Sequence, residues 1–241
     1  MTLRIAMWSG PRNISTAMMR SFENRPDTVV VDEPFYACYL QQTGLEHPMR
    51  EEVIASQSSV WREVVTDLCD KKCEADIFYQ KHMTHHMLDD IQLDWTRDLK
   101  HCFLVRDPEL VVNSYIKKME SVTAEDIGMQ RQERLYSEIS AISGQEIPVI
   151  DATRFLENPK AHLEILCAQL GIDFFNDMLQ WPAGRRESDG VWASHWYQNV
   201  EKSTGFATVS SERVALNPEQ MQVVEESRPY YRTLMERSIE V

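Results

Sequence analysis

The sequence has few cysteines and no long apolar run. Its five cysteines include no CxxC pair, and Cys69 and Cys73, which lie closest together, match neither a zinc knuckle nor a redox motif. No apolar stretch approaches the roughly 18 residues that a membrane span needs, and the apolar run at residues 5–8 is too short for a signal-peptide core. We therefore expect a soluble protein in a reducing, cytoplasmic compartment.

Basic side chains are fewer than acidic ones: the sequence has 25 Lys and Arg against 38 Asp and Glu, which gives a formal charge of −13. This balance argues against nonspecific binding to nucleic acid or to an anionic membrane, which clustered basic side chains drive. An anionic ligand must instead be held by a small local set of donors. The 241 residues, 43% of them hydrophobic, are typical of a globular chain, and we expect one domain over residues 1–241.

Short apolar runs alternate with helical patterns along the first part of the chain. They predict strands at residues 3–8, 28–31, 76–81, 101–105 and 147–150. Parallel strands need helical crossovers, so we expect an α/β fold of three αβα layers around a parallel sheet of about five strands. A long amphipathic helix is predicted at residues 124–142. Later residues predict a helical C-terminal cover, with helices at 159–170 and 218–237 and an ordered loop at 181–211.

Ligands of an open parallel sheet bind at the carboxyl ends of its strands, where helix N-termini present free backbone N–H groups. The turn after the first predicted strand combines the components of a phosphate cradle. It is not a Walker A loop, because the Gly-Lys pair is missing. The alternative is an ordinary turn with Ser15 or Thr16 as a helix cap. The candidate anion-binding residues of this turn are Gly10, Pro11, Arg12, Asn13, Ile14, Ser15 and Thr16.

A second candidate follows the fourth predicted strand. Arg106 leaves the strand end, and Ser114 lies about two turns along the next helix. The planar guanidinium and the hydroxyl could together hold a second phosphate. The sequence Arg106-Asp107-Pro108 is also consistent with simple helix capping, and the first turn is what favours the phosphate interpretation.

Together these elements resemble the sulfotransferase family that uses 3′-phosphoadenosine 5′-phosphosulfate (PAPS). Residues 11–16 resemble the family's 5′-phosphosulfate loop, and Arg106 with Ser114 resembles its 3′-phosphate motif. Residues 151–174 are similar to a segment frequent in bacterial members. The resemblance implies a P-loop nucleotide-hydrolase-like sulfotransferase fold with PAPS as co-substrate. Residues 184–192 resemble the C-terminal basic cofactor loop, which would add Arg185, Arg186, Gly190 and Trp192 to the cofactor-binding residues.

The implied reaction moves a sulfonate group from PAPS to a hydroxyl or amine of a small molecule, with no metal required. By this resemblance Arg12 stabilises the moving sulfonate and Lys81 is a second cation. Glu33, after the second strand, and His82, after the third, compete for the role of base, and we favour Glu33. The alternative for His82, His85 and His86 is a solvated turn. The pattern from Lys81 to His86 lacks a third ligand at convincing spacing, so we expect no metal site.

Three alternatives remain at this point. A nucleotide kinase or NTPase shares the α/β layout but needs Mg²⁺ and a Walker lysine. A noncatalytic nucleotide-binding relative is suggested by Asn13 and Ile14, where most bacterial members have Ser and Gly. A pyridoxal phosphate enzyme would depend on Lys81. Residues 35–45 and the helices up to residue 73 would line an acceptor pocket of partly apolar character, but the acceptor and the oligomeric state are not predicted.

Overall fold

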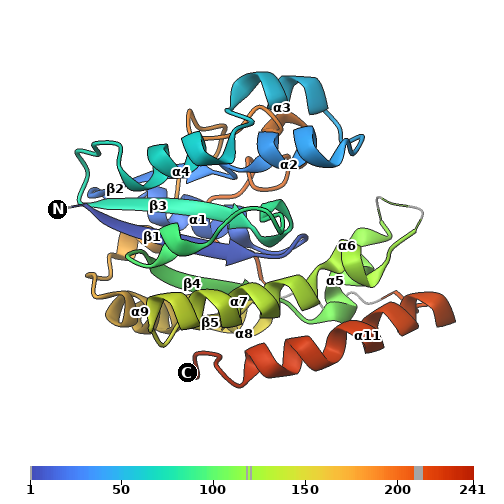
Figure 1. Cartoon of the computed structure of the whole chain (residues 1–241). Helices are drawn as coiled ribbons and strands as arrows, with labels where there is room; N and C mark the ends of the chain where they lie inside the picture. Colours follow the sequence, from blue (N-terminus) through green and yellow to red (C-terminus); the bar gives the residue numbers. More distant parts are fainter. Residues whose placement is uncertain (1, 118, 120, 209–213) are drawn as a thin grey trace.

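Five parallel strands form the centre of the computed structural model, which describes residues 2–117, 119, 121–208 and 214–241. The strand order is β2-β3-β1-β4-β5, so the chain crosses to opposite sides of β1. Ligands bind at such a reversal point, beyond the carboxyl ends of the strands. The predicted α/β fold and its five-stranded parallel sheet are confirmed (Figure 1). The strands are β1 (Leu3–Ser9), β2 (Thr28–Asp32), β3 (Ile77–Met83), β4 (Lys100–Val105) and β5 (Val149–Asp151).

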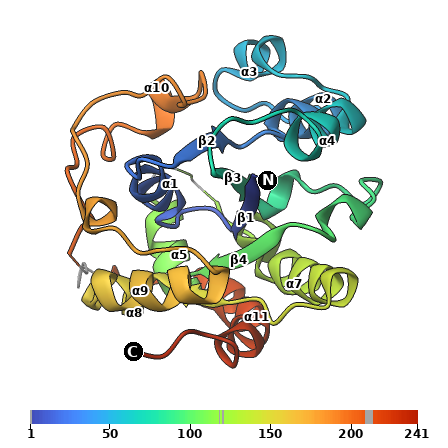
Figure 2. The ribbon, with the colours of Figure 1, turned by 90° about the vertical axis from the view of Figure 1, so that its left-hand side faces the viewer.

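Helices cover both faces of this sheet (Figure 2). Ile5 and Met7 of β1 belong to the core on one face, whereas Ala6 and Trp8 belong to the core on the other, as the alternation of side chains along a strand requires. The first face is covered by α1 (Ser15–Glu23), α8 (Ala152–Glu157) and α9 (Pro159–Leu170), and the second by α4 (Trp61–Cys69), α7 (Met129–Ser143) and α11 (Pro218–Met235).

A smaller apolar cluster lies beside the sheet and joins distant parts of the sequence. Tyr36 and Leu40 of α2 (Tyr36–Thr43) and Val53 of α3 (Arg50–Ser56) pack with Trp192 and Tyr197. The short helix α10 (Ala193–Trp196) belongs to this C-terminal segment, within the region where we predicted an ordered loop. Residues 209–211 of that predicted loop lie outside the described residues. None of the helices in the described ranges is long and apolar enough to cross a membrane.

The prediction of one helix over residues 124–142 was wrong. The chain forms α6 (Ala124–Ile127) and then α7, with Gly128 between them at a φ of 69°. A Cβ at Gly128 would lie 2.2 Å from Cε1 of His85, in the segment after β3. A left-handed backbone conformation is therefore needed at the position where the imidazole packs against the backbone. Only glycine adopts this conformation there without steric cost.

Gly128 and Gly144 offer a matched pair of substitutions, because Gly144 has a similar φ of 66° but a Cβ there would meet no other part of the chain within 4 Å. We expect Gly144→Ala to lower the free energy of unfolding by roughly 1–2 kcal/mol, the cost of a left-handed Cβ. Gly128→Ala should cost about 1–3 kcal/mol more, because His85 must also move. Urea unfolding curves measure both values, and equal losses would contradict the steric role assigned to His85.

Candidate active site

The turn between β1 and α1 is fixed by contacts to two other elements. A Cβ at Gly10 would lie 3.2 Å from Oε1 of Gln132 in α7, so the Gln132 side chain would have to shift slightly to admit a larger residue. Asn13 donates from Nδ2 to the carbonyl oxygen of Leu104 in β4, at 3.0 Å, and its Oδ1 accepts from the N–H of Ile14 at 2.8 Å. The turn is therefore held in one conformation before any ligand binds.

The N-terminus of α1 has no side-chain cap. Ile14 occupies the cap position and forms no side-chain hydrogen bond with the first turn, so neither Ser15 nor Thr16 caps the helix as the alternative interpretation required. The N–H groups of the first turn lack helical partners, and the helix dipole adds partial positive charge there. Pro11 and Arg12 lead directly into this end. The arrangement favours an anion.

Arg12, Arg106 and Ser114 come together from three elements. Nε of Arg12 donates to Oγ of Ser114 at 2.9 Å, and Nη1 of Arg106 donates to the carbonyl oxygen of Arg12 at 2.6 Å. Ser114 belongs to α5 (Pro108–Tyr115), and Arg12 has a left-handed φ of 56°. Arg12 thus links Arg106 and Ser114 beside the first turn.

These two guanidinium groups lack carboxylate partners. Among the described residues neither Arg12 nor Arg106 forms an ion pair. Burial lowers the pKa of both. The charge of Arg12 lowers the pKa of Arg106 further, while the more distant charges of Asp151 and Asp107 act to raise it. Two partly buried cations that repel each other beside a helix N-terminus would be stabilised by a bound anion.

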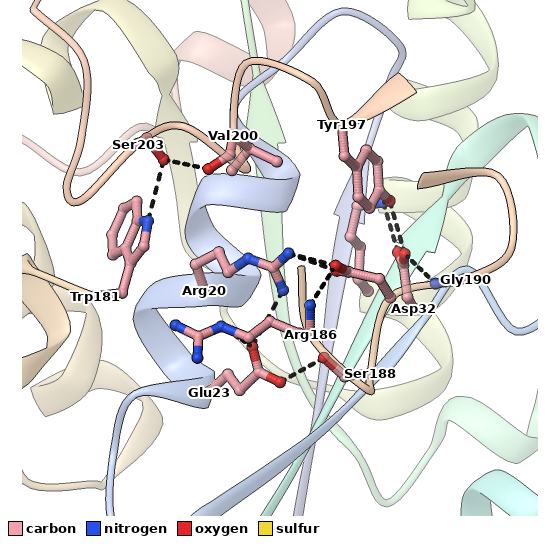
Figure 3. A network of polar contacts seen from close by, with 12 residues as sticks. Arg20, Glu23, Asp32, Trp181, Arg186, Ser188, Gly190, Tyr197, Val200 and Ser203 are labelled. Carbon is pink, nitrogen blue, oxygen red and sulfur yellow. Dashed lines mark hydrogen bonds and ion pairs between the residues drawn. The ribbon is translucent and has the colours of Figure 1, made fainter. Parts of the chain in front are cut away.

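A buried cluster of opposite charges lies at the ends of β2 and β3. Nζ of Lys81 donates to Oδ1 of Asp32 at 2.8 Å, to Oε1 of Glu33 and to the hydroxyl of Tyr197 at 2.9 Å. The Tyr197 hydroxyl donates to Oδ2 of Asp32 at 2.7 Å (Figure 3). Burial acts to lower the pKa of Lys81, but the two carboxylates raise it well above its ordinary value. Lys81 is therefore charged.

The two carboxylates of this cluster are not equivalent. Asp32 accepts from Lys81, from Tyr197 and, at 3.4 Å, from the N–H of Gly190, so both of its oxygens are engaged. Glu33 uses Oε1 for Lys81, while its Oε2 lies 3.9 Å from Nε2 of His86, beyond hydrogen-bonding distance. Burial raises the pKa of Glu33, and the charge of Lys81 partly offsets this. Glu33 is the carboxylate suited to exchange a proton.

His82 lies in the core instead of the site. Its ring stacks on Trp8 with centroids 4.4 Å apart, its side chain is buried, and Nε2 is 3.1 Å from Oε1 of Gln80. Burial lowers the pKa of His82 to about 3. Strand alternation explains the difference, because Lys81 and His82 point to opposite faces of β3. The geometry favours Glu33 over His82 as the base.

The alternative of a solvated turn does not hold for His86, which is buried, and His85 is half-buried. Nε2 of His85 lies 3.0 Å from the carbonyl oxygen of Glu125. His86 is 6% exposed and stacks on Tyr36. The sequence pattern could not assign His85 and His86 to different surroundings, because both belong to the short 3-10 helix η1 (Thr84–His86).

The predicted C-terminal cofactor residues are not brought to the turn at Arg12. Arg186 donates from Nη2 to the carbonyl oxygen of Pro182 at 2.9 Å, and its Nε lies 3.9 Å from Glu23, the last residue of α1 (Figure 3). Arg185 is exposed. Nine helical residues rise about 13 Å, so this segment lies near the other end of α1.

A buried ion pair explains this placement. Nη2 of Arg20 in α1 lies 2.6 Å from Oδ1 of Asp189, and both side chains are almost fully buried. Gly190 and Trp192 then support the Lys81 cluster instead: Nε1 of Trp192 donates to the Tyr197 hydroxyl at 3.2 Å. A Cβ at Gly190 would lie 2.2 Å from the Trp192 ring, so that contact needs glycine. No motif in the sequence links Tyr197 to Asp32 and Lys81, because these residues meet only in the folded chain.

No group of three or more His, Cys, Asp and Glu side chains in the described ranges is arranged to hold a metal ion.

A family model described as a sulfotransferase domain matches residues 3–238. Among curated proteins, branched-chain-amino-acid aminotransferase-like proteins 1 and 2 of Arabidopsis thaliana are 34% and 33% identical to this chain, over 95% and 85% of its length. The matches cover 41% and 36% of those proteins, so the chain spans about two fifths of the length of the curated relatives it matches.

Solved structures share the fold at low identity. A sulfotransferase from Alicyclobacillus acidocaldarius is 12% identical with a TM-score of 0.57, and the match covers 98% of this chain and 95% of that one. Mouse sulfotransferase SULT7A1, complexed with PAP, is 13% identical with a TM-score of 0.53, over 97% and 88%. The sulfotransferase domain from the curacin biosynthetic pathway is 14% identical with a TM-score of 0.52, over 94% and 97%.

The unpaired guanidinium groups predict stabilisation by a simple anion. Inorganic phosphate at about 100 times its Kd should stabilise the chain by about 2.7 kcal/mol, seen as a rise in Tm. We expect Arg12→Ala and Arg106→Ala to lose most of this rise. The control is Arg185→Ala, which removes an exposed arginine and should respond like the unsubstituted chain. A response lost in Arg185→Ala but kept in Arg106→Ala would place the anion on the C-terminal segment instead.

Proposed function

The chain belongs to the family of sulfotransferase domains, and from this membership we propose that it transfers a sulfonate group from PAPS to a hydroxyl or amine of a small-molecule acceptor. The observation that carries the proposal is the pair of guanidinium groups, without an ion-pair partner among the described residues, beside the uncapped N-terminus of α1. In the proposal Arg106 and Ser114 bind the 3′-phosphate. The first turn of α1, with Ser15 and Thr16, binds the 5′-phosphate.

The chemistry requires in-line placement, stabilisation of charge and a base. The acceptor atom attacks sulfur, and the bond from sulfur to the bridging phosphate oxygen breaks, with the electron pair leaving on that oxygen. Arg12 stabilises this developing charge, and Glu33 takes the acceptor's proton. Lys81 has a different role from the one the sequence suggested. Its three N–H donors are occupied by Asp32, Glu33 and Tyr197, so it holds the base in place and does not bind the sulfonate.

The alternative functions find less support. A kinase would need a Walker lysine, and the turn supplies Arg12. Asn13 fixes the turn without blocking the first N–H groups of α1, so its presence is no argument against turnover. A Schiff base to pyridoxal phosphate needs a neutral lysine amine, and Lys81 is charged and fully hydrogen-bonded. The aminotransferase-like names describe the whole plant proteins, and we do not extend that activity to this chain.

Nucleotide selectivity tests the proposed cofactor. Adenosine 3′,5′-bisphosphate should raise Tm, whereas ADP, which lacks the 3′-phosphate, and ATP with Mg²⁺ should do so much less at equal concentration. Ser114→Ala should weaken binding by about tenfold, the loss of one hydrogen bond to a charged group. Isothermal titration measures these affinities. Preference for ATP with Mg²⁺ would favour a kinase and overturn the proposal.

The pH dependence of turnover tests Glu33 as base. The carboxylate must be ionised to take a proton, and burial raises its pKa above the ordinary value of 4.5. The rate of sulfonate release from radiolabelled PAPS should therefore fall as pH drops through that raised pKa, at a pH above 4.5.

Glu33→Gln should lower kcat about 100-fold or more, the usual worth of a positioned base, with bisphosphate affinity unchanged. Glu187→Gln, at an exposed carboxylate, is the control and should leave the pH profile as it is. An acid limb that persists unchanged in Glu33→Gln would assign the titration to another group.

A further inference from the structure

The imidazole of His86 is held in one orientation beside Glu33. Its ring lies against Tyr36, with centroids 4.5 Å apart and planes at 11°, and against Tyr39, with centroids 5.0 Å apart. The side chain is 7% exposed. Its Nε2 lies 3.9 Å from Oε2 of Glu33, the oxygen that Lys81 does not occupy.

The surroundings of His86 also determine which nitrogen carries the proton. Burial, with a further contribution from the charge of Lys81, lowers the pKa of His86 well below its ordinary value, so the ring is neutral and has one N–H. Nδ1 is buried without a hydrogen-bond partner. A proton on Nδ1 would be a buried unsatisfied donor, whereas a proton on Nε2 faces the Glu33 carboxylate. The favoured tautomer therefore carries its N–H on Nε2.

The distance between Nε2 of His86 and Oε2 of Glu33 determines how the two groups can interact. At 3.9 Å it is too long for a direct hydrogen bond. One oxygen atom about 2.8 Å from each of them, an ordinary hydrogen-bond distance, would bridge the two groups. That oxygen would accept from the N–H of His86 and donate its own proton to Glu33.

We propose that the reacting oxygen of the acceptor binds between His86 and Glu33, so the acceptor is an alcohol or phenol and the product is a sulfate ester. This inference rests on the proposed sulfotransferase function. A hydroxyl oxygen has two lone pairs: one accepts from His86 and the other attacks sulfur. A neutral amine has a single lone pair, which cannot do both. The site therefore selects oxygen over nitrogen.

The step balances without a further reactant. The acceptor oxygen forms a bond to sulfur as its proton passes to Oε2 of Glu33. The bond from sulfur to the bridging oxygen of PAPS breaks, and the electron pair leaves with adenosine 3′,5′-bisphosphate. His86 keeps its proton throughout and acts as a donor that positions the oxygen.

The substitutions His86→Phe and His86→Gln distinguish the role of the N–H group from that of the aromatic ring. Phenylalanine keeps an aromatic ring between Tyr36 and Tyr39 but has no donor, whereas glutamine offers an amide N–H near the position of Nε2. The first assay is hydrolysis of radiolabelled PAPS, in which water supplies the oxygen. We expect hydrolysis to fall about tenfold or more in His86→Phe, the worth of one lost hydrogen bond, and to recover partly in His86→Gln. Bisphosphate affinity should stay unchanged in both variants.

The second assay compares phenol with aniline, which is uncharged at neutral pH, and adds benzyl alcohol as a second hydroxyl compound. Label should pass to phenol or benzyl alcohol at least about tenfold faster than to aniline, since only oxygen gains the His86 hydrogen bond. Equal or faster labelling of aniline would overturn the inference.

Unchanged hydrolysis in His86→Phe would overturn it as well. So would a chain that binds adenosine 3′,5′-bisphosphate yet transfers label neither to water nor to either hydroxyl compound. Failure to bind the bisphosphate at all would instead refute the proposed function, so the two failures are distinguishable.

Discussion

The buried ammonium group of Lys81 is the contact that holds together the cluster proposed to transfer the proton. It joins β3 to Asp32 at the end of β2, to Glu33 beyond it and to Tyr197 from the C-terminal segment. A charge buried this deeply is tolerated only when it is paired and hydrogen-bonded. The same contacts hold Glu33 at its left-handed φ of 41°, so the pairing that stabilises the lysine also aims the carboxylate.

The opposite arrangement holds on the other side of β1. Arg12 and Arg106 lie together without an ion-pair partner among the described residues, so a bound anion would relieve their mutual repulsion. In this account, a chain with a net charge of −13 binds its anion through these local donors. Affinity comes from a local concentration of donors at the uncapped end of α1, while the rest of the surface repels nonspecific polyanions. The Lys81 cluster and the arginine pair meet where the switch in strand order brings the ends of β1, β3 and β4 together.

Patterns that are local in sequence predicted most of this fold. The buried strands and the spacing of Arg106 and Ser114 were readable because strand and helix periods fix them. The break at Gly128 was not, since it depends on packing against His85, 43 residues earlier in the chain. The family resemblance assigned Arg185 and Arg186 to the cofactor, but the Arg20–Asp189 pair holds this segment near the far end of α1. Choosing among the histidines likewise required the three-dimensional neighbours of each ring.

A crystal structure with adenosine 3′,5′-bisphosphate tests the central claim most directly, because it locates both phosphates at once. The account predicts the 3′-phosphate between Arg106 and Ser114 and the 5′-phosphate on the first turn of α1, with the gap between Glu33 and His86 open toward the position that the sulfonate would occupy. A nucleotide bound at Arg185 and Arg186, or with its phosphates away from Arg12, would contradict it.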